Sequence, residues 1–240
     1  MKICIIELIA TRADSILGDE RLANLRRLMD FGLYGKLQSP LNGAAVSSSA
    51  LTALWQPLAG ACQQAVFMRA PELSRPESPN PAGASPNSSS EIASPSKQWT
   101  LLIDQLMNPS WDYIHFVDHP PDLAPYPETQ HSLRLDEQIG RVLEMLDDQT
   151  ALLVIGGLQP QPPNSGFFLL AAPTCPISGE FQTACLADLA PTLLELAGRP
   201  TPEGLPGRSL IDGLEKRVLN QASVDHDRIV LDRLAGLGYV

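Results

Sequence analysis

The segment from Trp111 to Leu158 constrains the fold more than any other part of the chain, because signals for a strand, a loop, a helix and a second strand follow one another. It begins with an aromatic and β-branched run that ends on the carboxylate of Asp118. Four prolines between Pro120 and Pro127 exclude regular structure, since each ring removes a backbone donor and fixes φ. The segment is therefore typical of a strand–helix–strand unit of an α/β protein.

A helix and a second strand complete this unit. Apolar residues recur at helical spacing, with charged residues between them, at Leu135, Ile139, Val142, Leu143 and Leu146. The continuous apolar run from Ala151 to Ile155 is expected of a strand buried on both faces of a parallel sheet. Because ligands bind outside the carboxyl ends of such strands, Asp118 and the Gly156-Gly157-Leu158 turn mark where a site would lie. Gly156-Gly157 offers backbone donors to an anion, but a plain tight turn is the preferred interpretation.

Strand and helix signals alternate along the rest of the chain. Further strands are predicted at Lys2–Ile9, Tyr34–Gln38, Ala65–Met68 and Gly166–Ala172. Further helices are predicted at Glu20–Phe31, Ser47–Trp55, Trp99–Met107, Asp188–Leu196 and Val224–Leu237. For the fourth of these, Asp188 is expected as N-cap, Pro191 in the first turn, and Gly198 with Pro200 at the end. The alternation predicts a three-layer αβα sandwich with a mostly parallel central sheet.

Composition narrows the class of protein and of partner. A chain of 240 residues with 44% apolar and 18% charged residues is expected to form one globular domain, residues 1–240. The formal net charge of −10 argues against nucleic acid or an anionic membrane as a partner. No stretch approaches the roughly 18 apolar residues of a membrane span.

The cysteines and the N-terminus predict a cytoplasmic protein. Cys4, Cys62, Cys175 and Cys185 show no paired spacing, so neither a zinc ribbon nor a disulfide framework is indicated. They are interpreted as small buried hydrophobes in a reducing compartment. The apolar run at the N-terminus is interrupted by Glu7, and no small-residue cleavage site follows, which indicates a first strand rather than a signal peptide.

The segment from Pro71 to Gln98 differs in composition from the rest. It holds six prolines and eight serines in 28 residues. Such a segment cannot bury enough apolar surface to offset the entropy lost on ordering. It is predicted to be a disordered surface loop that is dispensable for folding.

Four stretches together resemble the type I phosphodiesterase and nucleotide pyrophosphatase family of the alkaline phosphatase superfamily. They are Asn24–Leu37, Trp111–Asp118, Asp188–Leu194 with Gly207–Leu210, and Arg233–Val240. The resemblance spans nearly the whole chain outside the Pro/Ser-rich segment, and the Asp-Leu-Ala-Pro-Thr stretch is its most specific part. It implies an alkaline-phosphatase-like fold, and in active members two metal ions held by Asp and His with a Thr or Ser nucleophile. Such metals neutralise phosphoryl oxygens and activate the nucleophile.

The matching positions in this chain lack most of these residues. Where the family has Asp-Gly after the first strand, this chain has Ile9-Ala10, and the nucleophile position falls near Ala45. The family's Asp-His-Gly after the central strand is here Gly157-Leu158-Gln159, and the final His expected shortly before Gly166 is absent. The family's Asp, followed by His four residues on, becomes Asp118 and Asp122.

Asp118 is thus the one ligand left at its matching position, and a strand-end structural carboxylate is its preferred interpretation. Asp122 and the neighbouring His119 are the other vestigial metal-ligand candidates. One or two carboxylates cannot hold two divalent ions roughly 4 Å apart. The serine run Ser47-Ser48-Ser49 indicates a helix start, because no adjacent base is visible; a nucleophile displaced by two residues is the alternative. No catalytic residue, metal or cofactor is therefore predicted.

These absences favour a pseudoenzyme that acts as a binding or assembly partner of another protein, such as an intact family member. The alternative is a metal-dependent phosphodiesterase, phosphatase or sulfatase-like hydrolase with atypical ligands. The residues at the former ligand positions are mostly apolar and are predicted to close by packing or to be filled by a partner's side chains: Ile9, Ala10, Ala45, Gly157 and Leu158.

Overall fold

The computed structural model describes residues 1–9, 11–38, 48–69, 95–118, 128–158, 166–175, 178–182 and 184–212. The predicted helix at Val224–Leu237 and the family-like tail at Arg233–Val240 lie outside these ranges. Most of the Pro71–Gln98 segment also lies outside, so its predicted disorder stays a prediction.

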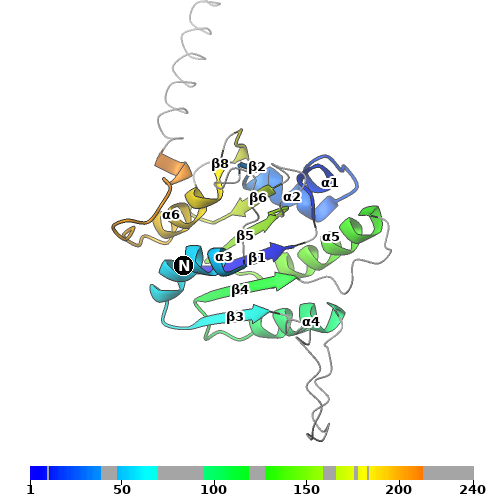
Figure 1. Cartoon of the computed structure of the whole chain (residues 1–240). Helices are drawn as coiled ribbons and strands as arrows, with labels where there is room; N and C mark the ends of the chain where they lie inside the picture. Colours follow the sequence, from blue (N-terminus) through cyan, green and yellow to red (C-terminus); the bar gives the residue numbers. More distant parts are fainter. Residues whose placement is uncertain are drawn as a thin grey trace, which may run out of the picture.

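An eight-stranded sheet forms the middle of the molecule, with strand order β3-β4-β1-β5-β6-β2-β7 and β8 also paired to β2 (Figure 1). All strands run in one direction except β6, which is antiparallel to both of its neighbours, β5 and β2. The mostly parallel sheet is therefore confirmed. The strands are β1 Lys2–Leu8, β2 Leu33–Gln38, β3 Ala65–Arg69, β4 Tyr113–Asp118, β5 Thr150–Gly156, β6 Gly166–Ala171, β7 Gly179–Glu180 and β8 Ala184–Cys185.

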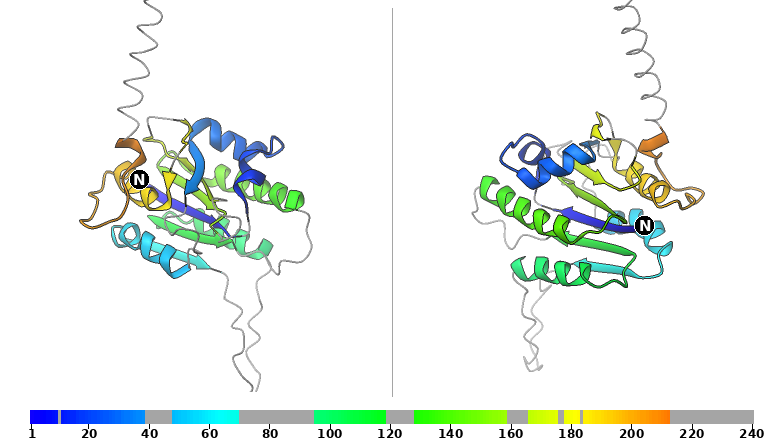
Figure 2. Two further views of the ribbon diagram at one scale, coloured as in Figure 1. Left: turned by 45° about the horizontal axis from the view of Figure 1, so that its top comes forward. Right: turned by 180° about the vertical axis from the view of Figure 1, so that it is seen from behind.

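Helices cover both faces of this sheet, which gives the predicted three layers (Figure 2). One face carries α1 Ala13–Leu17, α2 Ala23–Phe31, α4 Pro95–Leu106 and α5 Glu128–Met145. The other carries α3 Ser48–Gly60 and α6 Leu186–Leu196. None of the helices in the described part of the chain has the length and apolar character to cross a membrane.

Strand β1 explains why the central strands read as continuous apolar runs. Ile3 and Ile5 are buried in the hydrophobic cluster on the α3/α6 face, whereas Cys4, Ile6 and Leu8 are buried in the cluster on the opposite face. Because successive side chains of a strand point to opposite faces, a strand covered on both sides needs apolar residues at nearly every position. Burial on both faces therefore accounts for the pattern from which these strands were predicted.

Three helix starts differ from the prediction, and helix α1 was not predicted. Helix α2 begins at Ala23 rather than at Glu20. Helix α4 begins at Pro95 rather than at Trp99, so the last four residues of the predicted Pro/Ser-rich loop are helical. A proline is tolerated in a first turn because its missing N–H would have no partner there. Helix α6 has Cys185, not Asp188, as its N-cap, and Pro191 lies inside the helix rather than in its first turn. Asp188 sits at the third position, where its carboxylate accepts the Cys185 N–H at 2.9 Å, one half of a capping box.

Pro191, inside α6, leaves one helix carbonyl without its usual donor, and the segment that returns beside the helix passes close to this carbonyl. Pro191 has no N–H to donate to the carbonyl of Ala187, four residues earlier. Gly207, at φ 93°, passes so close to this carbonyl that a Cβ would collide with it. Glycine is therefore the residue that fits at this position, both for its positive φ and for its close approach.

Thr192 and Asp188 then bind this returning segment. The buried Thr192 hydroxyl donates to the Asp188 carbonyl at 2.6 Å and accepts the Leu210 N–H at 2.9 Å. The Asp188 carboxylate also accepts the Arg208 N–H at 2.9 Å. The Asp-Leu-Ala-Pro-Thr and Gly-Arg-Ser-Leu stretches of the family resemblance therefore form one structural clamp in this chain.

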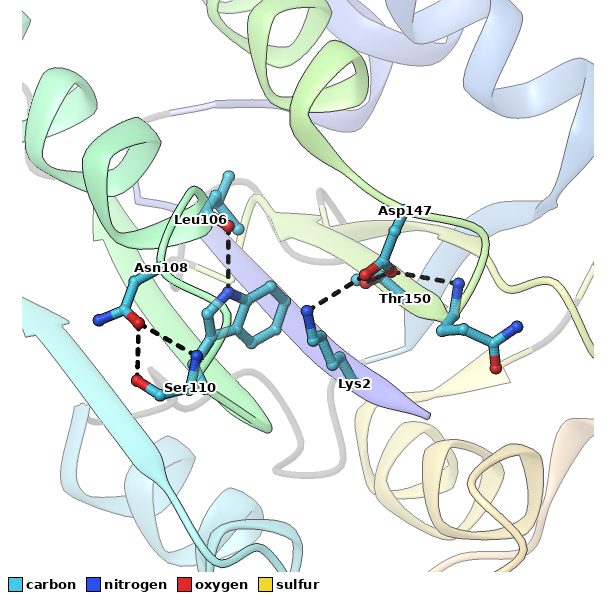
Figure 3. Close-up of polar contacts among 8 residues, drawn as sticks. Lys2, Leu106, Asn108, Ser110, Asp147 and Thr150 are labelled. Atoms are coloured by element: carbon cyan, nitrogen blue, oxygen red, sulfur yellow. Dashed lines mark hydrogen bonds and ion pairs between the residues drawn. The ribbon is translucent and has the colours of Figure 1, made fainter.

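Side-chain contacts connect the amino ends of the central strands, at the opposite end of these strands from the candidate site (Figure 3). The Lys2 ammonium lies 3.1 Å from Asp147 Oδ2 and 5.0 Å from the centre of the Trp111 ring. The Trp111 indole donates to the Leu106 carbonyl at 3.2 Å. These contacts join β1 to the turn before β5 and to the segment between α4 and β4.

Candidate functional site

The carboxyl ends of β4, β1 and β5 lie side by side, where the sequence places the candidate site. Leu8, the last residue of β1, is in register with Asp118 on one side and with Gly156 on the other. The next residue, Ile9, donates its N–H to the Asp118 carbonyl at 3.5 Å. The residues that follow these strands therefore meet at one edge of the sheet.

Asp118 is enclosed on the α4/α5 face of the sheet. Its side chain is 4% exposed, and Oδ1 accepts the indole N–H of Trp99 at 3.0 Å. The Trp99 ring also packs on Phe116, with ring centres 4.8 Å apart. Burial raises the pKa of Asp118 to about 6, against the opposing effects of the Trp99 hydrogen bond and of Arg134. The carboxylate thus holds α4 against the end of β4.

The turn after β5 is built by packing and by backbone conformation. Gly157 is buried with φ 68°, a conformation that favours glycine. Leu158 packs against the hydrophobic cluster on the α3/α6 face. A Cβ on Gly166 would lie 3.4 Å from Leu158 Cδ2, so the leucine side chain reaches the start of β6. Ile9 is only partly buried, so the prediction that it closes the former site by packing holds only in part.

The remaining candidates are only partly within the described chain. His119, Asp122, Ala10, Ala45 and Ser47 lie outside the described ranges, while Ser48 and Ser49 form the first turn of α3. Within the described ranges, no group of three or more His, Cys, Asp and Glu side chains could hold a metal ion. Segments 39–47, 119–127 and 159–165, which follow β2, β4 and β5, are not described.

A buried acid–base pair was not predicted from the sequence. His115 Nε2 lies 3.3 Å from Glu7 Oε2, and the two residues, on β4 and β1, are only 4% and 6% exposed. Both precede their strand ends and face α3, whose Trp55 ring meets the His115 ring edge-on at 6.4 Å. With this enclosure the pair satisfies two buried polar groups and offers no access to a substrate. The one sequence signal was Glu7 itself, which interrupts an otherwise apolar strand.

Comparison with known proteins gives matches of structure only. No protein family and no curated protein matches the sequence. A candidate sulfatase from Bacteroides thetaiotaomicron is similar at a TM-score of 0.57 and 13% identity, over 89% of this chain and 74% of that chain. A protein solved with its substrate D-glucosamine-2-N,6-O-disulfate has a TM-score of 0.58 and 12% identity, over 88% and 79%. The phosphonate monoester hydrolase of Silicibacter pomeroyi has a TM-score of 0.52 and 13% identity, over 87% and 75%.

These similarities concern the fold. They confirm the alkaline-phosphatase-like α/β architecture that the sequence predicts. At 12–13% identity they do not extend to the activity, and the narrower resemblance to type I phosphodiesterases is not confirmed.

Proposed function

We propose that this chain is a non-catalytic member of the alkaline phosphatase superfamily, from its type I phosphodiesterase and nucleotide pyrophosphatase branch, and that it acts as a binding or assembly partner. The observation that carries the proposal is the position of Asp118, the one residue that keeps a family ligand type. Its carboxylate is buried and accepts the indole N–H of Trp99. A metal ligand in an open site would instead be accessible to solvent at the carboxyl ends of the strands.

The neighbouring strand end supports the same proposal. Where the family resemblance expects Asp-His after the central strand, Gly157 forms a turn and the partly buried Leu158 packs against the core. For Asp118 to bind a metal there, its second oxygen, Oδ2, would have to become accessible at the strand ends, although the residue is 4% exposed.

A metal-dependent hydrolase of phosphate, phosphonate or sulfate esters is the second candidate function. It is favoured by the structural neighbours, which include a phosphonate monoester hydrolase and a candidate sulfatase. In this case the ligands would come from segments that follow the strands at the carboxyl edge. His119, Asp122 and Ser47 belong to such segments.

The net charge and the cysteines support a protein as the partner and the cytoplasm as the compartment. The formal net charge of −10 disfavours nucleic acid and anionic membranes as partners. The four cysteines form no disulfide with one another, which is typical of a reducing compartment.

Metal content and ester hydrolysis test the proposal directly. The purified full chain is analysed for bound metal by mass spectrometry and assayed with 4-nitrophenyl phosphate, bis(4-nitrophenyl) phosphate, a 4-nitrophenyl phosphonate and 4-nitrophenyl sulfate. We expect no stoichiometric metal and no hydrolysis above background with zinc, manganese, magnesium or calcium. A metal-dependent rate that disappears on Asp118→Ala or His119→Ala, in variants that remain folded, would restore the hydrolase.

A further inference from the structure

Among the described strands, β3 has a neighbour on one side only. It lies at one end of the sheet with β4 on one side, and no other strand of the described chain pairs with it (Figure 1). The Tyr113 N–H donates to the Gln64 carbonyl at 3.2 Å, which turns the backbone groups of Gln64 toward β4. Because backbone groups alternate along a strand, those of Phe67 point away from β4 and toward the open side.

This edge lacks the residues that usually keep strand edges apart. Its five residues, Ala-Val-Phe-Met-Arg, include no proline and no acidic residue, and the single cation, Arg69, stands at the end. Natural proteins protect such edges with charges, prolines or bulges, because open backbone groups are a template for another strand. The side chain of Phe67, in the middle of the strand, is 53% exposed.

Phe67 is also the outer member of a row of aromatic rings. Its ring centre lies 5.6 Å from that of Tyr113 and 6.2 Å from that of His115. The His115 ring in turn meets the fully buried Trp55. The row is therefore enclosed at its inner end and open at the edge of the sheet.

We propose that this edge pairs with β3 of a second copy of the chain, antiparallel about a twofold axis at Phe67. In this register Phe67 faces Phe67, Val66 faces Met68, and Ala65 faces Arg69. The two Phe67 residues exchange both backbone hydrogen bonds, their rings extend the aromatic rows across the seam, and no two like charges face each other. A twofold axis is also the commonest symmetry of protein dimers.

The proposal rests on the proposed role of the chain as an assembly partner and names one partner. Pairing along a five-residue strand buries a small area compared with the roughly 800 Å² that each partner buries in a stable interface. The dimer should therefore be concentration-dependent, with a dissociation constant on the order of micromolar.

Cysteine cross-linking tests the register. Directly opposite residues of an antiparallel pair have Cβ atoms about 4.5–5.5 Å apart, so a small shift brings two cysteines into disulfide range. Under mild oxidation the Phe67→Cys full chain should give a reducible dimer whose linked peptides both contain residue 67. Phe31→Cys is the matched control, because Phe31 is 71% exposed but lies on α2. Absence of the 67–67 link, or equal dimer yields from the two variants, would overturn the proposal.

Sedimentation velocity over a concentration series tests the strength of the contact. We expect the wild type to dimerise, Phe67→Lys to weaken the dimer at least tenfold, and Phe31→Lys to leave it unchanged. A wild type that stays monomeric throughout, or a dimer that is indifferent to Phe67→Lys, contradicts the edge pairing. The ester-hydrolysis assay separates the two proposals, since metal-dependent turnover would refute the non-catalytic role whether or not the dimer forms.

Discussion

At the scale of single residues, Asp118 is a buried carboxylate at the carboxyl end of β4. The carboxylate is 4% exposed and accepts the Trp99 indole N–H. Burial disfavours its charged form, and the pKa rises from 3.8 to about 6. The folded chain therefore keeps the Asp118 proton at pH values where the unfolded chain has lost it.

This difference predicts how stability depends on pH. Where the folded state binds more protons than the unfolded state, the free energy of unfolding falls as pH rises, here between about pH 4 and pH 6. Relative to Asp118→Asn, the wild type should lose about 2–3 kcal/mol between pH 4 and pH 7. Urea denaturation of both proteins across this range measures the difference.

Asp147 provides a control of opposite sign. Its hydrogen bond from Thr150 is the main cause of a lowered pKa, so its stabilisation is present above the unfolded pKa and is lost as pH falls through the folded value. The difference between wild type and Asp147→Asn should therefore grow with rising pH. A wild-type/Asp118→Asn difference that stays constant across the range would show that Asp118 is not buried as described.

The sequence indicated part of this residue-level arrangement. A carboxylate after an aromatic and β-branched run was interpreted as structural, but its partner was not identifiable. Trp99 and Asp118 are 19 residues apart, on a helix and a strand. Glu7 and His115 are 108 residues apart, so only the order of the strands brings them together. Contacts between elements depend on the order of the strands in the sheet. The hydrophobic periodicity of the sequence does not reveal that order.

At the scale of elements, the α6 clamp shows the same limit. A helix through Leu196 that Gly198 terminates was predicted; α6 does end at Leu196, and Gly198 has a positive φ of 64°. The start was wrong, because Asp188 works from the third position with Cys185 as N-cap. From the sequence alone, an Asp near a helix start is equally compatible with the N-cap position and with the third position of the helix. The binding of the returning segment by Thr192 was not foreseen either.

Thr192→Val should destabilise the protein by about 1–3 kcal/mol, because valine keeps the shape of threonine but leaves the buried Leu210 N–H without its acceptor. Urea denaturation measures the loss. The exposed Thr201 gives a matched control, and Thr201→Val should change stability by less than about 0.5 kcal/mol. Equal effects of the two substitutions would argue against the clamp.

At the scale of the whole molecule, alternating strand and helix signals predicted the three layers and the mostly parallel sheet. The direction of β6 was not predictable, because a strand buried on both faces has the same apolar pattern whichever way it runs. The assignment of residues 1–240 to one domain stays a prediction, since 213–240 lie outside the described chain.

The Pro/Ser-rich segment gives a prediction for the whole chain. Val66 and Met68 of β3 and Trp99 of α4 belong to one hydrophobic cluster, so these elements are packed together independently of the chain between them. Loop-closure entropy changes slowly with length, and shortening a loop about threefold changes stability by only about 1 kcal/mol. Replacing residues 71–94 by a short Gly/Ser linker should therefore shift the melting temperature by a few degrees at most.

A longer replacement serves as the control for this experiment. Substituting residues 71–98 also removes the first turn of α4, which begins at Pro95. That turn precedes Trp99, whose indole binds Asp118, so the longer replacement should lower the melting temperature clearly more than the shorter one. Thermal unfolding followed by circular dichroism compares the two. Insoluble or unfolded protein from the 71–94 replacement would mean that the segment packs against the core and that its composition was misinterpreted.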